Sequence, residues 1–260
     1  MGRLLTLLRR KGGFSPLDLD GLALWLDASD LSTITHSSGA VSQWDDKSGY
    51  ARHATQGDAA YQPTTGTMTL NGRNVLAFST DILNLANAAG VFRNAGVGTA
   101  FAVARSTETT TPRRFLLGFS TNSPTQARFT PFANQAVNRF GFGGRRLNTD
   151  SFQTVSSTQD HAAAWRLAMF EVAWVNGQAR IRENGAETLA PTAFQSAGSS
   201  DDSDSAAVQI GGLSTGDPGV TSWPGEIAEL IVVRTAARLT AGEIASVERY
   251  LAAKWGVTLA

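Results

Sequence analysis

The sequence contains no cysteine, which excludes every function that depends on a thiol. Disulfide scaffolds, thiol nucleophiles and thiolate metal sites all need cysteine, whereas its absence is compatible with both the cytosol and the outside of a cell. An excess of one charge is also missing, because the chain has 22 basic and 22 acidic residues. This balance disfavours a broad basic surface for nucleic acid. A hydrophobic content of 42 % argues against an unfolded chain.

Long apolar runs are absent as well. No stretch approaches the roughly 20 apolar residues that cross a bilayer, so we expect no membrane partner. The amino terminus holds two leucine pairs, but most of its positive charge follows them, which is the wrong order for a secretory signal. Because the chain has 260 residues and no segment typical of a linker, we expect one domain with one large core.

The first eleven residues form a basic and apolar arm. They hold four of the 22 basic residues and no acidic one, which leaves 18 basic against 22 acidic residues in the rest of the chain. About ten residues is marginal for an isolated helix in water. The arm is therefore either a frayed terminus or a peg that docks on a neighbouring subunit. The residues expected to dock are Arg3, Leu4, Leu5, Leu7, Leu8, Arg9, Arg10 and Lys11.

From residue 17 onward, short apolar runs alternate with turn residues, a pattern typical of an all-β sandwich or barrel. Two Asn-Gly pairs, Asn176-Gly177 and Asn184-Gly185, are hairpin signals, because both central positions of a type I′ turn need positive φ. Together they predict an antiparallel meander over residues 166–190. The expected strands are 22–26, 41–44, 74–78, 99–105, 115–119, 139–142, 166–175, 179–183, 208–211 and 226–234.

One helix is expected, at the carboxyl terminus. Thr240 and Glu243 form a capping box, and Gly256 stands where a left-handed terminating residue is needed. The apolar residues between them follow the spacing of a single buried stripe on a helix that lies on the sandwich. This stripe is Ile244, Val247, Leu251 and Trp255. We therefore divide the chain into an arm (1–16), a sandwich (17–238) and a helix packed on it within the same domain (239–260).

Four segments carry a resemblance to a known family. They are Leu22–Asp30 (LALWLDASD), Trp44–Gly49 with Arg52–Thr55, Gly225–Val233 (GEIAELIVV) and Val247–Val257 (VERYLAAKWGV). In these segments the chain resembles the concanavalin A-like, laminin-G-like jelly-roll proteins over roughly residues 17–258. The resemblance implies two curved antiparallel sheets stacked face to face, with Trp25 and Trp44 in or near the core. Proteins similar to this variant occur in bacteria and tailed bacteriophages, often as virion or surface components.

The sequence does not predict an enzyme. Glycoside hydrolysis needs two carboxylates about 5 to 9 Å apart, and the glucanase form of this fold places them in the pattern Glu-x-Asp-x-x-Glu. Glu171 lacks these partners, and Glu226 and Glu229 are expected on opposite faces of their strand. No Gly-x-Ser-x-Gly motif accompanies the histidines, which are expected in loops or turns. These are His36, His53 and His161.

Calcium is the one candidate cofactor, because laminin-G-like relatives often hold it through loop oxygens. The candidate ligands are two aspartate pairs, Asp27 with Asp30 and Asp45 with Asp46, which offer the hard oxygen atoms that calcium takes. None has the spacing of an EF-hand loop. The alternative for the second pair is that its carboxylates accept backbone hydrogen bonds in a tight turn ending at Gly49.

Two functions of different classes remain. The first is a non-catalytic bacteriophage virion protein, a head-decorating or tail-associated subunit that packs on capsid proteins and on copies of itself. The second is a lectin-like module that binds cell-surface glycans, outside the cell or on its surface. Sugar binding needs an exposed aromatic ring near polar groups, and the candidates are Trp223 beside Asp217, and Tyr61. The arm and the lack of a secretion signal favour the virion interpretation.

Overall fold

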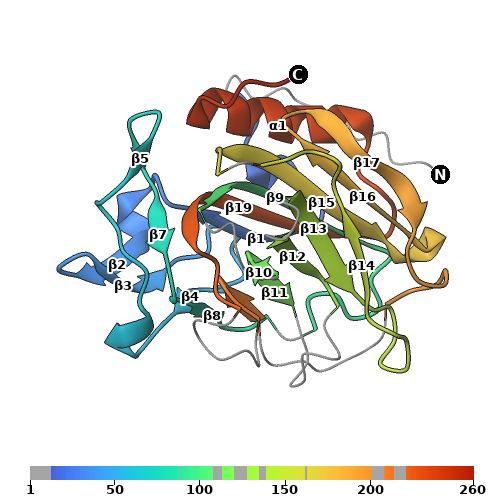
Figure 1. The fold of residues 1–260 in the computed structure, drawn as a ribbon, viewed down its shortest axis with the longest axis horizontal. Coiled ribbons are helices and arrows are strands. Elements are labelled where there is room, and N and C mark those ends of the chain that lie inside the picture. The colour runs from blue at the N-terminus through green and yellow to red at the C-terminus, as the bar shows by residue number, and fades with distance from the viewer. Residues whose placement is uncertain are drawn as a thin grey trace, which may run out of the picture.

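The computed structural model describes residues 13–88, 90–107, 113–119, 128–134, 139–161, 163–200, 208–213 and 221–260. In these residues the chain is almost entirely β, with a single α-helix at its carboxyl terminus (Figure 1). The strands pair antiparallel throughout the described sheets. The docking arm expected at the amino terminus lies outside the described residues.

The largest sheet has seven strands in the order β1-β19-β9-β15-β16-β17, with β7 also paired to β19. Its long central strands combine β-branched and aromatic residues, which suit a pleated surface buried on both sides. The strands are β1 (Leu22–Asp27), β7 (Leu76–Phe78), β9 (Val97–Ser106), β15 (Arg166–Ala173), β16 (Gln178–Glu183), β17 (Ala186–Ala193) and β19 (Gly225–Thr235).

Three smaller sheets complete the β structure. A six-stranded sheet has the order β11-β18-β8-β4-β3-β2, a four-stranded sheet has the order β10-β12-β13-β14, and β5 pairs with β6. The strands of the six-stranded sheet are β2 (Ile34–Ser37), β3 (Ala40–Trp44), β4 (Ala54–Thr55), β8 (Leu83–Leu85), β11 (Leu117–Phe119) and β18 (Val208–Ile210). The others are β5 (Thr69–Leu70), β6 (Arg73–Asn74), β10 (Arg114–Phe115), β12 (Thr130–Asn134), β13 (Arg139–Gly144) and β14 (Gln153–Ser156).

The seven-stranded sheet separates two hydrophobic cores. Ala100 and Ala102 of β9 face the inner core, where this sheet packs against the six- and four-stranded sheets. Phe101 and Val103 face the other way and lie under the helix α1 (Ala241–Trp255). Because successive side chains of a strand point to opposite faces, β9 contributes to both cores and is buried along nearly its whole length. The predicted all-β sandwich with a carboxyl-terminal helix is confirmed.

The helix begins and ends where the sequence predicts. The Thr240 hydroxyl accepts a hydrogen bond from the backbone N–H of Glu243, and the Glu243 carboxylate accepts one from the backbone N–H of Thr240. Gly256 closes the helix in the left-handed conformation with φ of 68°. The buried stripe is confirmed, because its four predicted residues all lie in the core under the helix. No helix among the described residues is long and apolar enough to cross a membrane.

Only one of the two predicted hairpin turns has the expected form. Asn184 and Gly185 have φ values of 49° and 84° and connect β16 to β17, as a type I′ turn requires. Asn176 instead ends a 3₁₀ helix (Trp174–Asn176), and Gly177 alone is left-handed. The type I′ prediction is therefore wrong at the first position, although β15 and β16 still pair antiparallel.

Candidate functional site

The most elaborate polar arrangement in the molecule is centred on Glu229, whose side chain is fully buried between β19 and α1. One carboxylate oxygen accepts hydrogen bonds from Trp25 Nε1 at 2.7 Å and from the Tyr250 hydroxyl at 2.8 Å. The other accepts from Lys254 Nζ and Trp255 Nε1, both at 2.7 Å. Four donors from β1 and α1 therefore converge on one carboxylate.

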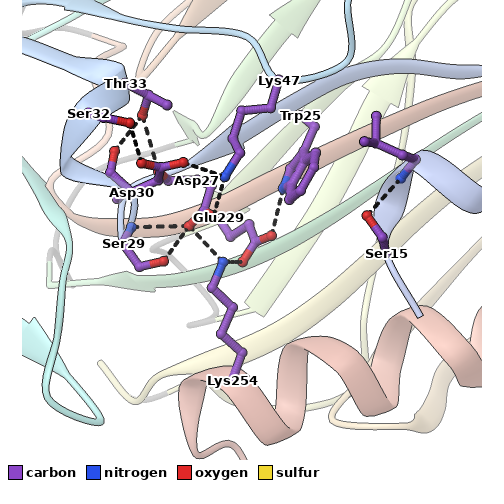
Figure 2. A network of polar contacts seen from close by, with 12 residues as sticks. Ser15, Trp25, Asp27, Ser29, Asp30, Ser32, Thr33, Lys47, Glu229 and Lys254 are labelled. Carbon is purple, nitrogen blue, oxygen red and sulfur yellow. Dashed lines mark hydrogen bonds and ion pairs between the residues drawn. The ribbon is translucent and has the colours of Figure 1, made fainter. Parts of the chain in front are cut away.

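Asp27 extends this network, because it lies directly opposite Glu229 in the β1–β19 pair. Its carboxylate binds Lys254 Nζ at 2.6 Å and Lys47 Nζ at 3.0 Å, and Lys47 also binds Asp30 at 2.7 Å (Figure 2). Burial alone would raise the pKa of Asp27, but hydrogen bonds from Lys254, Ser29 and Lys47 hold it below its ordinary value. Asp27 is therefore ionised and compensated by two ammonium groups.

This network shows what residues in two of the segments that carry the family resemblance do in the structure. Residues of the LALWLDASD segment and of the VERYLAAKWGV segment meet at Glu229 and Asp27 and fix α1 on the sheet. Burial raises the pKa of the Tyr250 hydroxyl, which stays protonated and donates its hydrogen bond to Glu229. We call this set of residues (Trp25, Asp27, Lys47, Glu229, Tyr250, Lys254 and Trp255) the helix clamp. Its charged groups bind one another, which makes it a structural device.

The four aspartates expected as calcium ligands do not form one site. Asp27 and Asp30 share the ammonium of Lys47. Asp46 accepts hydrogen bonds from the backbone N–H groups of Trp25, Ser48 and Arg52, which confirms the tight-turn alternative for this residue. Asp45 binds the Gln43 amide and lies 3.0 Å from Nδ1 of His53. Among the described residues, no group of three or more acidic or histidine side chains could hold a metal ion.

The buried carboxylates on the sheet are likewise paired. The sequence places Glu226 and Glu229 on opposite faces of β19, but the register between β19 and β9 shifts between Ile227 and Glu229. This β-bulge adds one residue, so both carboxylates lie on the side that faces the helix. Glu226 binds Arg105 at 2.7 Å, and Glu229 belongs to the helix clamp. Glu171 is fully buried and bound to Arg180 at 2.8 Å and Arg238 at 3.0 Å.

The structure does not offer the glycan contacts that the sequence suggests. Trp223 is fully buried in the inner core, so the prediction of an exposed platform there is wrong. Tyr61 is half-buried in a 3₁₀ helix (Ala59–Tyr61). Asp217 lies outside the described residues. His161, expected in a loop, does lie between β14 and β15, but it is fully buried and stacked on Phe140 at 5.1 Å.

An aromatic ring that the sequence analysis passed over has the required exposure. Tyr50 is 57 % exposed and is the one exposed aromatic side chain among the described residues. It lies between the two quoted segments Trp44–Gly49 and Arg52–Thr55, at the tip of the loop that joins β3 to β4. A Gly followed by an aromatic residue at the centre of a polar loop is the signal that would have indicated it.

The loop that carries Tyr50 is held in one conformation by its own hydrogen bonds. Asp46 caps the turn, and Gly49 and Ala51 take left-handed φ values of 92° and 52°. The Arg52 guanidinium lies 4.4 Å from the centre of the Tyr50 ring. Arg52 also donates to the carbonyl of Ala23 at 2.6 Å, which ties the loop to β1.

Polar groups lie near this ring, both on the loop that carries Tyr50 and on a neighbouring loop. Asn87 accepts a hydrogen bond from Arg52 Nε through its carbonyl at 3.2 Å and donates from Nδ2 to the carbonyl of Ala51 at 3.1 Å. His53 and Asp45 follow at the partly exposed base of the loop. We call Tyr50, Arg52, His53, Asp45 and Asn87 the Tyr50 surface. It combines an exposed ring with amide, imidazole and carboxylate groups in a preformed arrangement.

Comparison with known proteins identifies the fold and no family. No protein-family model matches the sequence, and no curated protein matches it. Among solved structures, a sialidase of Trypanosoma rangeli in complex with the inhibitor DANA is similar with a TM-score of 0.58 and 16 % identity, over 88 % of this chain and 33 % of that one. A structure of botulinum neurotoxin type C, described by its interaction with two ganglioside molecules, gives a TM-score of 0.57 and 13 % identity, over 89 % of this chain and 51 % of that one.

A third similar structure is the CBM40 of the Ruminococcus gnavus IT-sialidase bound to α2,3-sialyllactose. It has a TM-score of 0.48 and 16 % identity, over 59 % of this chain and 83 % of that one. The present chain matches about a third of the sialidase chain and half of the neurotoxin chain. The likeness to the sialidase and neurotoxin structures establishes a shared jelly-roll-like sandwich. Neither of these two descriptions concerns a virion protein.

Proposed function

We propose that this chain is a non-catalytic, lectin-like module that binds a carbohydrate through the Tyr50 surface. The observation that carries the proposal is the exposed ring of Tyr50, held in place by Arg52 and by a loop with internal hydrogen bonds. A sugar ring has one apolar face of C–H groups, which packs on an aromatic ring, and a rim of hydroxyl groups, which need hydrogen-bond partners. The amide of Asn87 and the groups of His53 and Asp45 supply such partners.

The fixed geometry of the loop favours binding. A ligand that meets a preformed surface does not have to order the loop, so less of the interaction free energy is lost on association. Arg52 contributes to this order because its guanidinium is fixed by two backbone carbonyls, those of Ala23 and Asn87. The exposed ring is therefore available as a rigid contact area with little entropy to lose.

The comparisons support a carbohydrate partner. The similar neurotoxin structure is described by its ganglioside interaction, and the similar sialidase by its complex with an inhibitor. A non-catalytic role fits the paired state of Glu171, Glu226 and Glu229. A location on a cell surface or outside the cell follows from this proposal. The virion role depends on the amino-terminal arm, which lies outside the described residues, and it stays a prediction.

The test is a glycan array followed by calorimetric titration of the glycans that bind. We expect Tyr50→Ala to weaken binding by about tenfold or more, since a stacked ring contributes on the order of 1 kcal/mol beyond its buried area. Tyr50→Phe should keep most of the affinity. Leu17→Ala, at another exposed apolar side chain, is the matched control and should bind like the wild type.

Two further comparisons separate the alternatives. Tyr61→Ala tests the ring suggested by the sequence, and titration with calcium chloride against a chelator tests the calcium expectation. The absence of any bound glycan, or equal binding by Tyr50→Ala and the wild type, would contradict the proposal. Binding that disappears on removal of calcium would mean that a metal site, rather than the Tyr50 surface alone, carries the recognition.

A further inference from the structure

A groove of about 390 Å³ opens beside the seven-stranded sheet, where β9 begins and where β15 and β19 end. Its lining residues include Asn94, Val175, Ser199, Arg234 and Thr235. This volume lies within the range of small-molecule sites, which are concave and combine apolar walls with a few fixed polar groups. Val175, 41 % exposed, supplies an apolar wall.

Backbone contacts hold the walls of this groove in place. A Cβ atom on Gly96 would come within 2.2 Å of the Ala236 carbonyl oxygen, so only glycine allows these two segments to approach. The Gly96 carbonyl accepts a hydrogen bond from Val175 N–H at 3.2 Å, and the Ala95 carbonyl accepts one from Ser200 N–H at 3.0 Å. The groove is therefore formed before any ligand arrives.

Among the described residues, the groove is lined by a positive charge and by no carboxylate. Arg234, which lines it, donates to the carbonyl of Arg93, and Arg146 donates to the carbonyl of Ser199 at 3.4 Å. Neither Arg234 nor Arg146 forms an ion pair with a described residue. Three other arginines of the sheet and Arg238, just after it, are paired with glutamates; the three are Arg105, Arg180 and Arg182. No described carboxylate pairs with Arg234 in the groove or with Arg146, which lies beside it at Ser199.

An amide group adds to this set, because Asn94 lines the same groove and is exposed. Guanidinium and amide donors together suit a group rich in oxygen acceptors and negative charge, because guanidinium matches carboxylate and sulfate geometry with paired hydrogen bonds.

The groove and the Tyr50 surface lie at the same end of the β1–β19 pair. Arg52 of the Tyr50 surface binds the carbonyl of Ala23 near the start of β1. The Arg234 backbone N–H donates to the Gly21 carbonyl at 2.8 Å, just before the same strand. A ligand longer than one sugar unit therefore finds an aromatic contact and a cationic groove along one edge of the sandwich.

From this arrangement we infer that the groove binds the oxyanion of an acidic saccharide, a carboxylate or a sulfate, with Arg234 as its principal partner and Arg146 as a second positive charge. The inference rests on the proposed function and specifies its ligand class. Val175 packs against the apolar part of the charged sugar unit. Asn94 is positioned to donate hydrogen bonds to its oxygen atoms.

The experiment compares charged saccharides with neutralised forms of the same molecules. The probes are trigalacturonate and its methyl ester, and sulfated and desulfated galactan oligosaccharides, titrated by calorimetry at low and high salt. The wild type should bind at least one acidic probe at least tenfold more tightly than its neutral form. The difference should shrink at high salt, where exposed charges are screened.

Matched arginine variants locate the effect. Arg234→Gln should lower affinity for the acidic probe at least tenfold and leave the neutral probe unchanged, with a smaller loss for Arg146→Gln. Arg249→Gln is the control, because Arg249 is exposed on α1 and, within the part of the chain that the structure describes, hydrogen-bonded only to Ser246. Arg234→Lys keeps the positive charge and should retain part of the preference. Thermal melting of each variant excludes unfolding as the cause of lost binding.

The outcomes separate this inference from the proposed function. Equal binding of charged and neutral probes, or an Arg234→Gln variant that binds like the wild type, would overturn the groove and leave the Tyr50 proposal standing if Tyr50→Ala still loses binding. Loss of acidic-probe binding in Arg234→Gln with no effect of Tyr50→Ala would uphold the groove and overturn the Tyr50 contact. Binding of free sodium sulfate with no affinity for any acidic probe would overturn the saccharide assignment.

Discussion

Glu229 shows how one buried side chain accounts for several residues that are distant in the sequence. A carboxylate removed from water is costly unless charge and hydrogen bonds compensate it. Two indole N–H groups, a phenol and an ammonium meet this need, and each comes from β1 or α1. Trp25, Tyr250, Lys254 and Trp255 of the helix clamp therefore depend on the same acceptor, and Asp27 joins Lys47 to them through Lys254.

The first prediction concerns this carboxylate. Glu229→Gln removes the charge that balances Lys254 and turns an amide N–H₂ toward groups that are themselves donors. We expect a loss of about 3–5 kcal/mol in the free energy of unfolding, as for other buried ion pairs that lose one partner. Urea denaturation followed by circular dichroism measures it. Glu187→Gln, at an exposed position, should change stability by less than about 0.5 kcal/mol. A loss below about 1 kcal/mol at Glu229 would show that the clamp contributes little.

His161 gives a prediction about pH. Burial lowers its pKa below 6.5, and the nearby charges of Asp160 and Arg166 act in opposite directions. The unfolded chain therefore takes up a proton at a pH where the folded chain does not. Stability should rise with pH between the lowered pKa and 6.5, and fall as pH drops below about 6.5. Both ring nitrogens lack hydrogen-bond partners among the described residues, so the neutral ring acts as an apolar core group.

The measurement is urea denaturation at pH 5.5 and pH 8.0. The free energy of unfolding of His161→Phe minus that of the wild type should be higher at pH 5.5 than at pH 8.0. The reason is that the variant has no proton to take up on unfolding at this position. His36→Gln, at an exposed strand position, is the control and should follow the wild type at both values. The same pH dependence in wild type and His161→Phe would assign the slope to other groups.

At the scale of elements, one side chain of α1 belongs to both the apolar stripe and the helix clamp. Trp255 is fully buried under the helix and also donates to Glu229. Trp255→Ala should cost roughly 3–5 kcal/mol by opening a cavity. Trp255→Phe keeps most of the apolar volume but loses the N–H donor, so it should fall between the wild type and Trp255→Ala. Chemical denaturation of the three proteins distinguishes packing from hydrogen bonding, and equal stability of the two variants would mean that the hydrogen bond dominates.

Elements with a strong local signal could be predicted from the sequence. Features that depend on how distant strands pair could not. The capping box at Thr240 and the Asn184-Gly185 turn act within a few residues, so their patterns are local. The bulge near Ile227 depends on the register between β19 and β9, which no local pattern contains. β17 (Ala186–Ala193) has no strand pattern of its own, because it is an edge strand with Pro191 and little apolar alternation, and only the predicted meander over residues 166–190 covers part of it.

In the candidate site, too, local features could be predicted from the sequence and non-local ones could not. Asp46 as a turn cap was predictable, because a short acidic side chain before Gly49 is a local turn signal. The exposure of an aromatic ring is not local, since it depends on what the rest of the chain covers. Trp223 therefore appeared available in the sequence and is buried, whereas Tyr50 is exposed. The pairing of Lys47 with Asp27 and Asp30 also depends on the arrangement of three separate segments.

For the whole molecule, the packing determines where a ligand has access. The helix covers the outer face of the seven-stranded sheet, and the six- and four-stranded sheets cover its inner face. The edge of the sandwich near the start of β1 carries Tyr50 on the loop between β3 and β4, and Arg234 at the end of β19, and both residues are exposed. Binding residues on loops held by a rigid sandwich are a common arrangement. The helix clamp thus fixes the packing of the sandwich, and the open edge leaves access for a ligand.

The last prediction tests the arm against this compact body. Phe14 packs on Tyr250 with ring centres 5.9 Å apart, so the contact between the chain's beginning and α1 starts at residue 14 and survives deletion of residues 1–12. We expect the deletion to change the melting temperature by less than about 2 °C and to abolish self-association, which light scattering coupled to size-exclusion chromatography measures. A large fall in melting temperature would place the arm in the core. An unchanged oligomeric state would remove self-association from its roles, and with it the main support for a virion subunit built from copies of this chain.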